Sequence, residues 1–319
     1  MLPIKQIGNN GIIKRMIYTC TVNPSLDYYL TIDKEIKLGE LNRLKDEEYV
    51  AGGKGVNVSI ALNNLMMPSV ALGFLGGFTR EFYLSFLTQY RYMQPRFTSI
   101  EGNTRINIKL RGYQETYLNA HGPHITEEEF NKFLKRIDRI DTSDIFILSG
   151  NVQHDIYEEM VNVLADLNSR NVKLIIDSDP RLVRASLQYR PLLIKPEISE
   201  FEELCGETIT STEQLIEESK KLVAAGAQNV IVSLGIDGAL LINEEGVYRY
   251  TPKDDKVVSL TGCGDAMIGA YVFNLQRGAN ALEAFEYACA ASDATARVES
   301  IANREDIEKF YENIVIERI

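Results

Sequence analysis

The sequence is poor in the residues that mark several common classes of protein. Its 319 residues contain no tryptophan, three histidines and four cysteines. The cysteines are scattered and no two form a Cys-x-x-Cys pair, so neither a zinc site nor a disulfide framework is expected, and the thiols should be reduced. The net charge of −11 argues against a nucleic-acid partner. A few local lysines and arginines can nevertheless build a positive pocket for a small anion.

Long apolar runs are also missing. No stretch approaches the roughly 18 residues that suggest a membrane-spanning helix. Residues 1–15 lack the apolar core and cleavage site of a signal peptide, and a strand-like run begins at Met16. We therefore expect a cytoplasmic protein without a membrane contact. Residues 1–15 are interpreted as an N-terminal extension outside the fold core.

From residue 16 onward, short apolar runs of strand length alternate with helical patterns. The expected strands are 16–22, 69–77, 144–150, 173–179, 191–196 and 229–235. The expected helices are 55–65, 126–139, 155–170, 211–225, 262–277 and 281–298. Continuous apolar runs suit parallel strands that are buried on both faces. The alternation predicts one α/β domain, residues 16–319, with a doubly wound, mostly parallel sheet flanked by helices.

Two stretches, 28–50 and 104–120, alternate apolar and polar residues instead. This pattern is typical of strands with one face in water. They are predicted to form a small β-sheet lid. In α/β sheets ligands bind outside the carboxyl ends of the strands, so a lid over that edge would exclude water from a bound ligand.

Glycines precede two of the expected helices. In "AGGKGVNVS" (51–59) a helix start with bare N–H groups could bind an anion, with Lys54 adding charge, or the glycines could form a structural turn. In "LTGCGDAMIGAYV" (260–272), Gly262 and Gly264 could expose N–H groups to a transferring phosphoryl group. Asp265 could then take a proton from an attacking hydroxyl, or could simply complement the helix dipole. The dipole should keep the pKa of Asp265 low.

Other motifs offer polar groups on expected loops and strands. Asp27 of "NPSLD" lies at the carboxyl edge of the first strand and could accept hydrogen bonds from sugar hydroxyls, or could be a turn residue. Arg105 and Asn107 of "NTRINIKL" share one face of a lid strand, where Arg105 could bind a phosphate or face solvent. In "SLGIDGALL" the Gly235 and Gly238 turn could admit a phosphate tail or form a plain hairpin.

In combination these motifs resemble the ribokinase-like sugar kinases of the PfkB family, most of all its 1-phosphofructokinase and tagatose-6-phosphate kinase branch. "NPSLD", "GGKGVNVS", "GFLGG", "NTRINIKL", "LSG", "KP..SE", "SLGIDGAL" and "TGCGDAMIGAY" occur in the family's order. The resemblance implies ATP- and Mg²⁺-dependent phosphorylation of a phosphorylated ketohexose, with fructose 1-phosphate as the first candidate. Tagatose 6-phosphate and fructose 6-phosphate are alternatives, and a non-catalytic sugar-phosphate binder is an alternative of another class.

The resemblance also implies roles for individual residues. Asp265 is similar to the catalytic base, and Gly262, Cys263 and Gly264 are similar to the anion hole. The sugar hydroxyls would be contacted by Asp27, Gly53 and Asn57, and the phosphate already on the sugar by Lys54, Arg105 and, nearby, Asn107. Contacts to the nucleotide phosphates would come from Lys195, Ser233, Gly235 and Gly238, and Glu200 would be linked to the metal. In several members the lid mediates dimers, which implies a possible homodimer.

The sequence departs from the family pattern at three places. Glu197 stands where the usual "KPNxxE" motif has Asn, and its carboxylate could add a metal contact or repel a nucleotide phosphate. Cys263 replaces Ala in "GAGD" and still supplies a backbone N–H, so we expect the change to be tolerated. "LSGNVQHDIY" replaces "SGSLP", which could alter the sugar pocket and the specificity.

Overall fold

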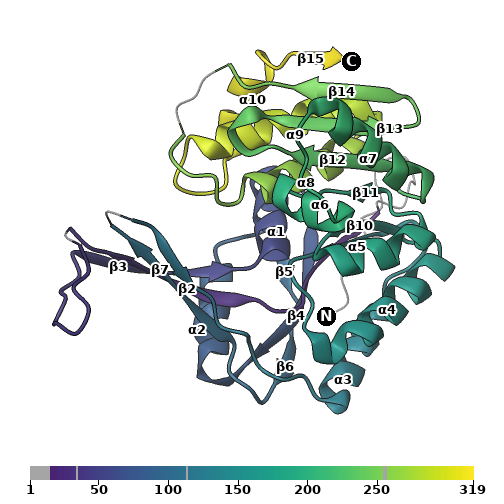
Figure 1. Cartoon of the computed structure of the whole chain (residues 1–319). Helices are drawn as coiled ribbons and strands as arrows, with labels where there is room; N and C mark the ends of the chain where they lie inside the picture. The colour runs from purple at the N-terminus through teal and green to yellow at the C-terminus, as the bar shows by residue number, and fades with distance from the viewer. Residues whose placement is uncertain (1–14, 34, 113, 254–256) are drawn as a thin grey trace.

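A computed structural model describes residues 15–33, 35–112, 114–253 and 257–319 (Figure 1). The predicted extension 1–15 lies outside these residues, apart from Arg15. Within them, most strands join one 11-stranded sheet. In order across it, the strands are β15 (Ile316–Arg318), β14 (Gly246–Tyr250), β13 (Ala239–Asn243), β12 (Asn229–Ser233), β11 (Leu193–Ile194), β10 (Lys173–Asp177), β9 (Ile145–Ser149), β1 (Ile17–Thr21), β4 (Ser69–Gly76) and β5 (Met93–Pro95), with β6 (Thr98–Ile100) also paired to β4.

The pairing is parallel from β12 to β5 and antiparallel from β12 to β15. The predicted mostly parallel sheet is therefore confirmed. The expected strand 191–196 is wrong in length, because only Leu193–Ile194 form β11. Pro191 and Pro196 bound this stretch and carry no N–H for a ladder bond. Pro196 still takes part as an acceptor, since its carbonyl binds the N–H of Ser233 at 3.1 Å.

Helices cover both faces of the sheet. One face packs against α1 (Lys54–Asn64), α8 (Cys263–Gln276), α9 (Ala281–Ala296) and α10 (Arg304–Tyr311). The other packs against α3 (Glu127–Ile137), α4 (Tyr157–Ser169), α5 (Pro180–Ser186), α6 (Ile198–Cys205) and α7 (Thr212–Ala224). A third core cluster joins α2 (Gly77–Leu87) to the β4 edge. Short 3₁₀ turns are η1 (His154–Ile156), η2 (Leu187–Tyr189) and η3 (Gly235–Asp237).

This two-layer covering explains the sequence pattern. Side chains of β1, β9 and β10 alternate between the two core clusters, so Ile17 and Ile145 face one and Tyr18 and Phe146 the other. A strand with two buried faces needs apolar residues at consecutive positions. Figure 1 shows the resulting helix–sheet–helix body. No described helix has the length and apolar character to cross a membrane.

The segments predicted as a lid form a separate four-stranded sheet. Its order is β3 (Asp46–Gly52), β2 (Ser25–Thr31), β7 (Arg105–Arg111) and β8 (Thr116–Leu118). Figure 1 shows it projecting from the main body beside α2. The β2–β7 pair is parallel and places Asp27 opposite Asn107. The sheet is thus anchored at the carboxyl end of β1, the edge at which the main sheet is expected to bind ligands.

Candidate active site

Asp265 lies in the first turn of α8, and its side chain is buried. Asn57 of α1 donates a hydrogen bond from Nδ2 to Asp265 Oδ2 at 2.8 Å. The two helices begin at the same edge of the sheet, and each is preceded by a glycine with positive φ, Gly53 at 139° and Gly262 at 82°. The glycine-rich turns therefore bring together two predicted site residues that lie 208 positions apart.

The prediction of a low pKa for Asp265 is wrong. Burial raises its pKa to about 7, repulsion by Asp177 adds to the rise, and the Asn57 hydrogen bond, Lys54 and Lys195 oppose it. The dipole favours a carboxylate in the first turn of a helix, but the cost of burying the charge is larger here, because Asp265 is only 6% exposed. A carboxylate with a pKa near 7 can accept a proton at physiological pH, as a general base requires.

A buried carboxylate, Asp177, joins two lysines beside Asp265. It ends β10 and its side chain is 1% exposed. Its Oδ1 lies 3.5 Å from Lys54 Nζ and 3.4 Å from Lys195 Nζ, and neither oxygen accepts a hydrogen bond from a described residue. Two buried oxygens without hydrogen bonds are costly unless a further positive partner reaches them. The site therefore has unsatisfied acceptor capacity for a cation.

Glu200, the predicted metal-linked acid, lies on the exposed side of this cluster. Its Oε1 accepts from Lys54 Nζ at 2.9 Å, and its Oε2 accepts from the Glu197 N–H at 3.0 Å. Burial alone would lower the pKa of Lys54, but Asp177 and Glu200 outweigh it and raise that pKa. Lys54, predicted to bind the sugar phosphate, is thus paired with acids from β10 and α6. Its predicted role stays a prediction.

Gly264, part of the predicted anion hole, leaves room for the Lys195 side chain. A Cβ at Gly264 would lie 2.8 Å from Lys195 Nζ, so any larger residue would push against this fully buried lysine. The N–H groups of Gly264 and Asp265 have no acceptor among the described residues, whereas the Cys263 N–H donates to Leu260 O at 3.3 Å. Two free N–H groups at the start of a helix, next to a lysine, can stabilise a transferring phosphoryl group.

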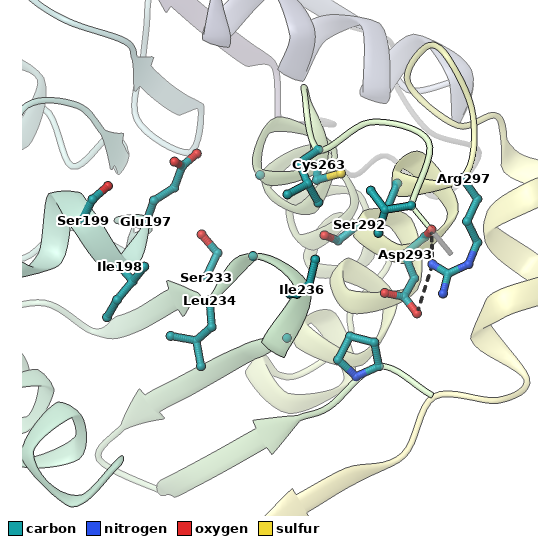
Figure 2. Close-up of a pocket in the computed structure, with 17 residues that line it drawn as sticks. Glu197, Ile198, Ser199, Ser233, Leu234, Ile236, Cys263, Ser292, Asp293 and Arg297 are labelled. Atoms are coloured by element: carbon teal, nitrogen blue, oxygen red, sulfur yellow. Dashed lines mark hydrogen bonds and ion pairs between the residues drawn. The ribbon is translucent and has the colours of Figure 1, made fainter. Parts of the chain in front are cut away.

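A pocket of about 260 Å³ opens from this point (Figure 2). The predicted nucleotide contacts Ser233, Gly235 and Gly238 line it together with Cys263 and Gly264. In Figure 2, Glu197 and Ser233 come from the strand side, while Ser292 and Asp293 come from α9 on the opposite side. The structure therefore brings the predicted anion hole and the predicted nucleotide residues into one cavity, and Lys195 adjoins it at Gly264.

The four-stranded sheet that was predicted as a lid carries the remaining predicted substrate residues. Asp27 Oδ1 accepts from Ser25 Oγ at 2.7 Å and from Asn107 Nδ2 at 2.9 Å. Arg105 donates to Asn23 O at 3.0 Å and to Ala120 O at 2.9 Å, and its Nε is buried without a partner among the described residues. Burial lowers the pKa of Arg105, which Asp27 opposes. Asp27, Asn107 and Arg105 thus form one polar group on the lid.

Several residues of this site were missed by sequence reasoning. Asp177 follows an apolar strand run, and a carboxylate at the carboxyl end of a parallel strand was a usable signal. Ser292, Asp293 and Arg297 line the pocket from the end of α9. They sit in a helical pattern without glycines or a motif, so nothing in the sequence distinguishes them from surface residues.

Glu197 begins α6 as its N-cap. Its backbone N–H donates to Oε2 of Glu200, the third residue of the helix, at 3.0 Å, which is the backward bond of a capping box. Glu197 also lines the pocket, and its Oε1 lies 3.9 Å from a Cβ placed on Gly264. The position that departs from the family pattern therefore serves the local fold while placing a carboxylate near the anion hole.

Comparison with known proteins identifies the class. The chain belongs to the pfkB family of carbohydrate kinases, whose model matches residues 21–307. It is therefore a sugar kinase, which transfers a phosphoryl group to an alcohol, and it has the ribokinase-like α/β fold.

Individual relatives narrow the class to kinases of the phosphofructokinase type. A 1-phosphofructokinase of Borreliella burgdorferi is 39% identical, over 95% of this chain and 99% of that protein. A D-tagatose-1-phosphate kinase of Bacillus licheniformis is 32% identical, over 88% of this chain and 92% of that protein. The solved phosphofructokinase-2 of Escherichia coli in complex with substrates and products is 25% identical, with a TM-score of 0.88, covering 94% of this chain and 99% of that one.

Proposed function

We propose that the protein transfers the γ-phosphate of ATP to the free terminal hydroxyl of a ketohexose 1-phosphate. Fructose 1-phosphate is the first candidate, with fructose 1,6-bisphosphate as its product. The observation that carries the proposal is the position of Asp265, a buried carboxyl in the first turn of α8 beside two N–H groups that have no acceptor among the described residues. The names of the two curated relatives support the substrate class, because both refer to ketohexose 1-phosphates.

In this mechanism Asp265 removes the proton from the sugar hydroxyl, whose oxygen attacks the γ-phosphorus. The bond from that phosphorus to the bridging oxygen of ADP breaks, and ADP leaves with the bonding electron pair. The N–H groups of Gly264 and Asp265 and the ammonium of Lys195 stabilise the charge on the phosphoryl oxygens. Asn57 orients the base through its hydrogen bond at 2.8 Å.

The residues present fit a magnesium ion. Magnesium is usually held by one or two carboxylates together with waters and substrate phosphates. Asp177, with two buried oxygens free of hydrogen bonds, and Glu200 would hold it here. The ion would neutralise charge on the triphosphate.

The lid supports a substrate that already carries a phosphate. Arg105 has a buried Nε that no described residue satisfies, and two of its other donors point to backbone carbonyls. A phosphate could displace those neutral acceptors, because charge-assisted hydrogen bonds are roughly twice as strong. Asp27 and Asn107, bonded at 2.9 Å, would then contact the sugar hydroxyls between Arg105 and Asp265. A homodimer through the lid remains a prediction, which light scattering can test.

The experiment is a turnover assay with ATP and Mg²⁺ across fructose 1-phosphate, fructose 6-phosphate, tagatose 6-phosphate and fructose. We expect the highest kcat/KM for fructose 1-phosphate and the lowest for unphosphorylated fructose. A preference for a 6-phosphate would contradict the assignment of the acceptor end. Absence of turnover on every sugar at all magnesium concentrations would favour a sugar-phosphate binder instead.

A further inference from the structure

A second polar hollow lies at the edge of the main sheet opposite the active site. It has a volume of about 250 Å³, and its polar lining residues are Asn168, Asn171, Lys173, Tyr189, Arg190 and Gln228. Lys173 is the first residue of β10, while Asp177 of the active site is the last. At about 3.3 Å per residue the strand separates the two by roughly 13 Å. The hollow is therefore distinct from the nucleotide pocket.

The charge of the hollow contrasts with that of the chain. No Asp or Glu is among the residues that line it, although the chain carries a net charge of −11. In the part of the chain that the structure describes, neither the Lys173 ammonium nor the Arg190 guanidinium forms an ion pair or a hydrogen bond. Two uncompensated cations that line one small hollow create a local positive potential, which attracts anions.

The negative partial charge at the carboxyl end of α4, beside the hollow, is too small to neutralise both Lys173 and Arg190. The carboxyl end of α4 carries a negative partial charge of about half a unit. Two of the carbonyl groups at this end already accept hydrogen bonds. The Asn171 N–H donates to Asn168 O at 2.9 Å, and the Val172 N–H donates to Leu167 O at 3.0 Å. Two full positive charges exceed this half charge, so the hollow stays positive.

The backbone of Arg190 adds an independent observation. Arg190 follows η2 in the left-handed region, with φ 50° and ψ 59°. Glycine adopts this conformation freely, whereas other residues are disfavoured there. The backbone geometry therefore gives no reason for an arginine, and its side chain lines the hollow. Unfavourable conformations of this kind are concentrated at functional sites.

We propose that this hollow is a second anion site, which binds a small phosphorylated metabolite. Lys173 and Arg190 bind its phosphate group, and the amides of Asn168, Asn171 and Gln228 bind its hydroxyl or carboxylate groups. Gln228 is held in place by its own bond from Nε2 to Arg190 O at 2.8 Å, which leaves its Oε1 as an acceptor.

Calorimetric titration of the full chain tests this site. The probes are 3-phosphoglycerate, inorganic phosphate and D-glycerate, with Mg²⁺ and a non-hydrolysable ATP analogue at saturation to occupy the nucleotide pocket. We expect 3-phosphoglycerate to bind best, inorganic phosphate less tightly and D-glycerate not at all. If phosphate binds as tightly as the ester, the amides take no part and the metabolite assignment is wrong.

Variants locate the binding. Arg190→Gly removes the charge and relieves the left-handed backbone, so the protein should melt at the same temperature or higher while losing at least about tenfold in affinity. Lys173→Gln should lose a similar factor. Both should keep kcat/KM for the sugar phosphate within about twofold. Arg105→Ala, on the lid, should leave this affinity unchanged. Binding that survives Arg190→Gly and disappears in Arg105→Ala would place the anion at the lid and overturn the proposal.

Discussion

Asn57 Nδ2 donates a 2.8 Å hydrogen bond to Asp265 Oδ2 and so joins the first turns of α1 and α8. This bond connects the "GGKG" and "GCGD" turns. The carboxylate shares its helix turn with the N–H groups of Gly264 and Asp265, which have no acceptor among the described residues, and it interacts electrostatically with Lys54 and Lys195. The proposed proton transfer depends on this alignment, which sits on two helix starts that packing against the sheet holds rigid.

The raised pKa of Asp265 predicts a dependence of stability on pH. The folded-state pKa of about 7 lies above the ordinary value of 3.8, so the folded protein binds an extra proton between these values. Stability contributed by this group is present below pH 3.8 and is lost as the pH rises to about 7. Asp265→Asn removes the titration. Relative to wild type, it should gain on the order of 2–4 kcal/mol of unfolding free energy between pH 4 and pH 8.

Denaturant unfolding of both proteins at several pH values measures this difference. Cys263→Ala is the control, because burial raises the pKa of that thiol to about 12 and it does not titrate in this range. Parallel curves for wild type and Asp265→Asn would show that Asp265 titrates normally.

Asp177 should influence the base through space. It is the second cause, after burial, that raises the pKa of Asp265. Asp177→Asn should therefore move the inflection of kcat/KM against pH to a lower value, because the carboxylate of Asp265 would then form more easily. The ionisation of the substrate phosphates is common to both enzymes and cancels in the comparison. Glu197→Asn, which changes a neighbouring carboxylate that does not contribute to this shift, should leave the inflection in place.

Gly264 should be required for catalysis more than for folding. A Cβ there would lie 2.8 Å from Lys195 Nζ, so Gly264→Ala should displace the lysine or the free N–H groups. We expect kcat to fall about 10²-fold, in line with the loss of one preorganised donor. Cys263→Ala changes the preceding residue without adding volume and should keep kcat within about threefold. If steady-state kinetics showed equally small changes in kcat for Gly264→Ala and Cys263→Ala, the transferring phosphoryl group would not bind at Gly264.

Arg105→Ala should weaken sugar-phosphate binding and spare the nucleotide. Loss of charge-assisted bonds to a phosphate predicts a rise of about 10- to 100-fold in the KM for the sugar phosphate, with the KM for ATP changed less than about threefold. Arg111→Ala is a matched control on the same strand, since that guanidinium stacks 4.0 Å from the Tyr29 ring. Equal losses for both substrates would remove Arg105 from the proposed role.

Much of the fold follows from local patterns. The apolar runs predicted β1, β4, β9, β10 and β12, because the side chains on both faces of these strands are buried. The stretches that alternate apolar and polar residues predicted the second sheet. The error at 191–196 came from reading apolar residues between two prolines as a full strand. The apolar residues of this stretch correctly indicate that it is buried. A β-strand also needs backbone N–H groups for its hydrogen bonds to the neighbouring strands, and proline has none.

The structure brings Gly264, Lys54 and Asp265 together around Lys195 and Asp177, at positions where glycine, charge and motif order coincide in the sequence. The site was not predictable where the partner comes from another part of the chain. The pairing of Lys54 with Glu200 at 2.9 Å is an example, since Glu200 lies 146 positions along the chain. The pKa of Asp265 depends on burial and on Asp177, which lies on another strand. A local motif shows neither the ion pair of Lys54 nor the pKa of Asp265, because both depend on how distant elements of the chain pack together.

We propose that Asp265 is the base in phosphoryl transfer from ATP to a ketohexose 1-phosphate. The most direct test is the rate of fructose 1,6-bisphosphate formation from fructose 1-phosphate and ATP at pH 8, for wild type and Asp265→Asn. We expect turnover by the wild type and a loss of at least about 10²-fold in kcat for the variant, with fructose 1-phosphate still bound. Wild-type turnover by a folded Asp265→Asn protein would contradict it.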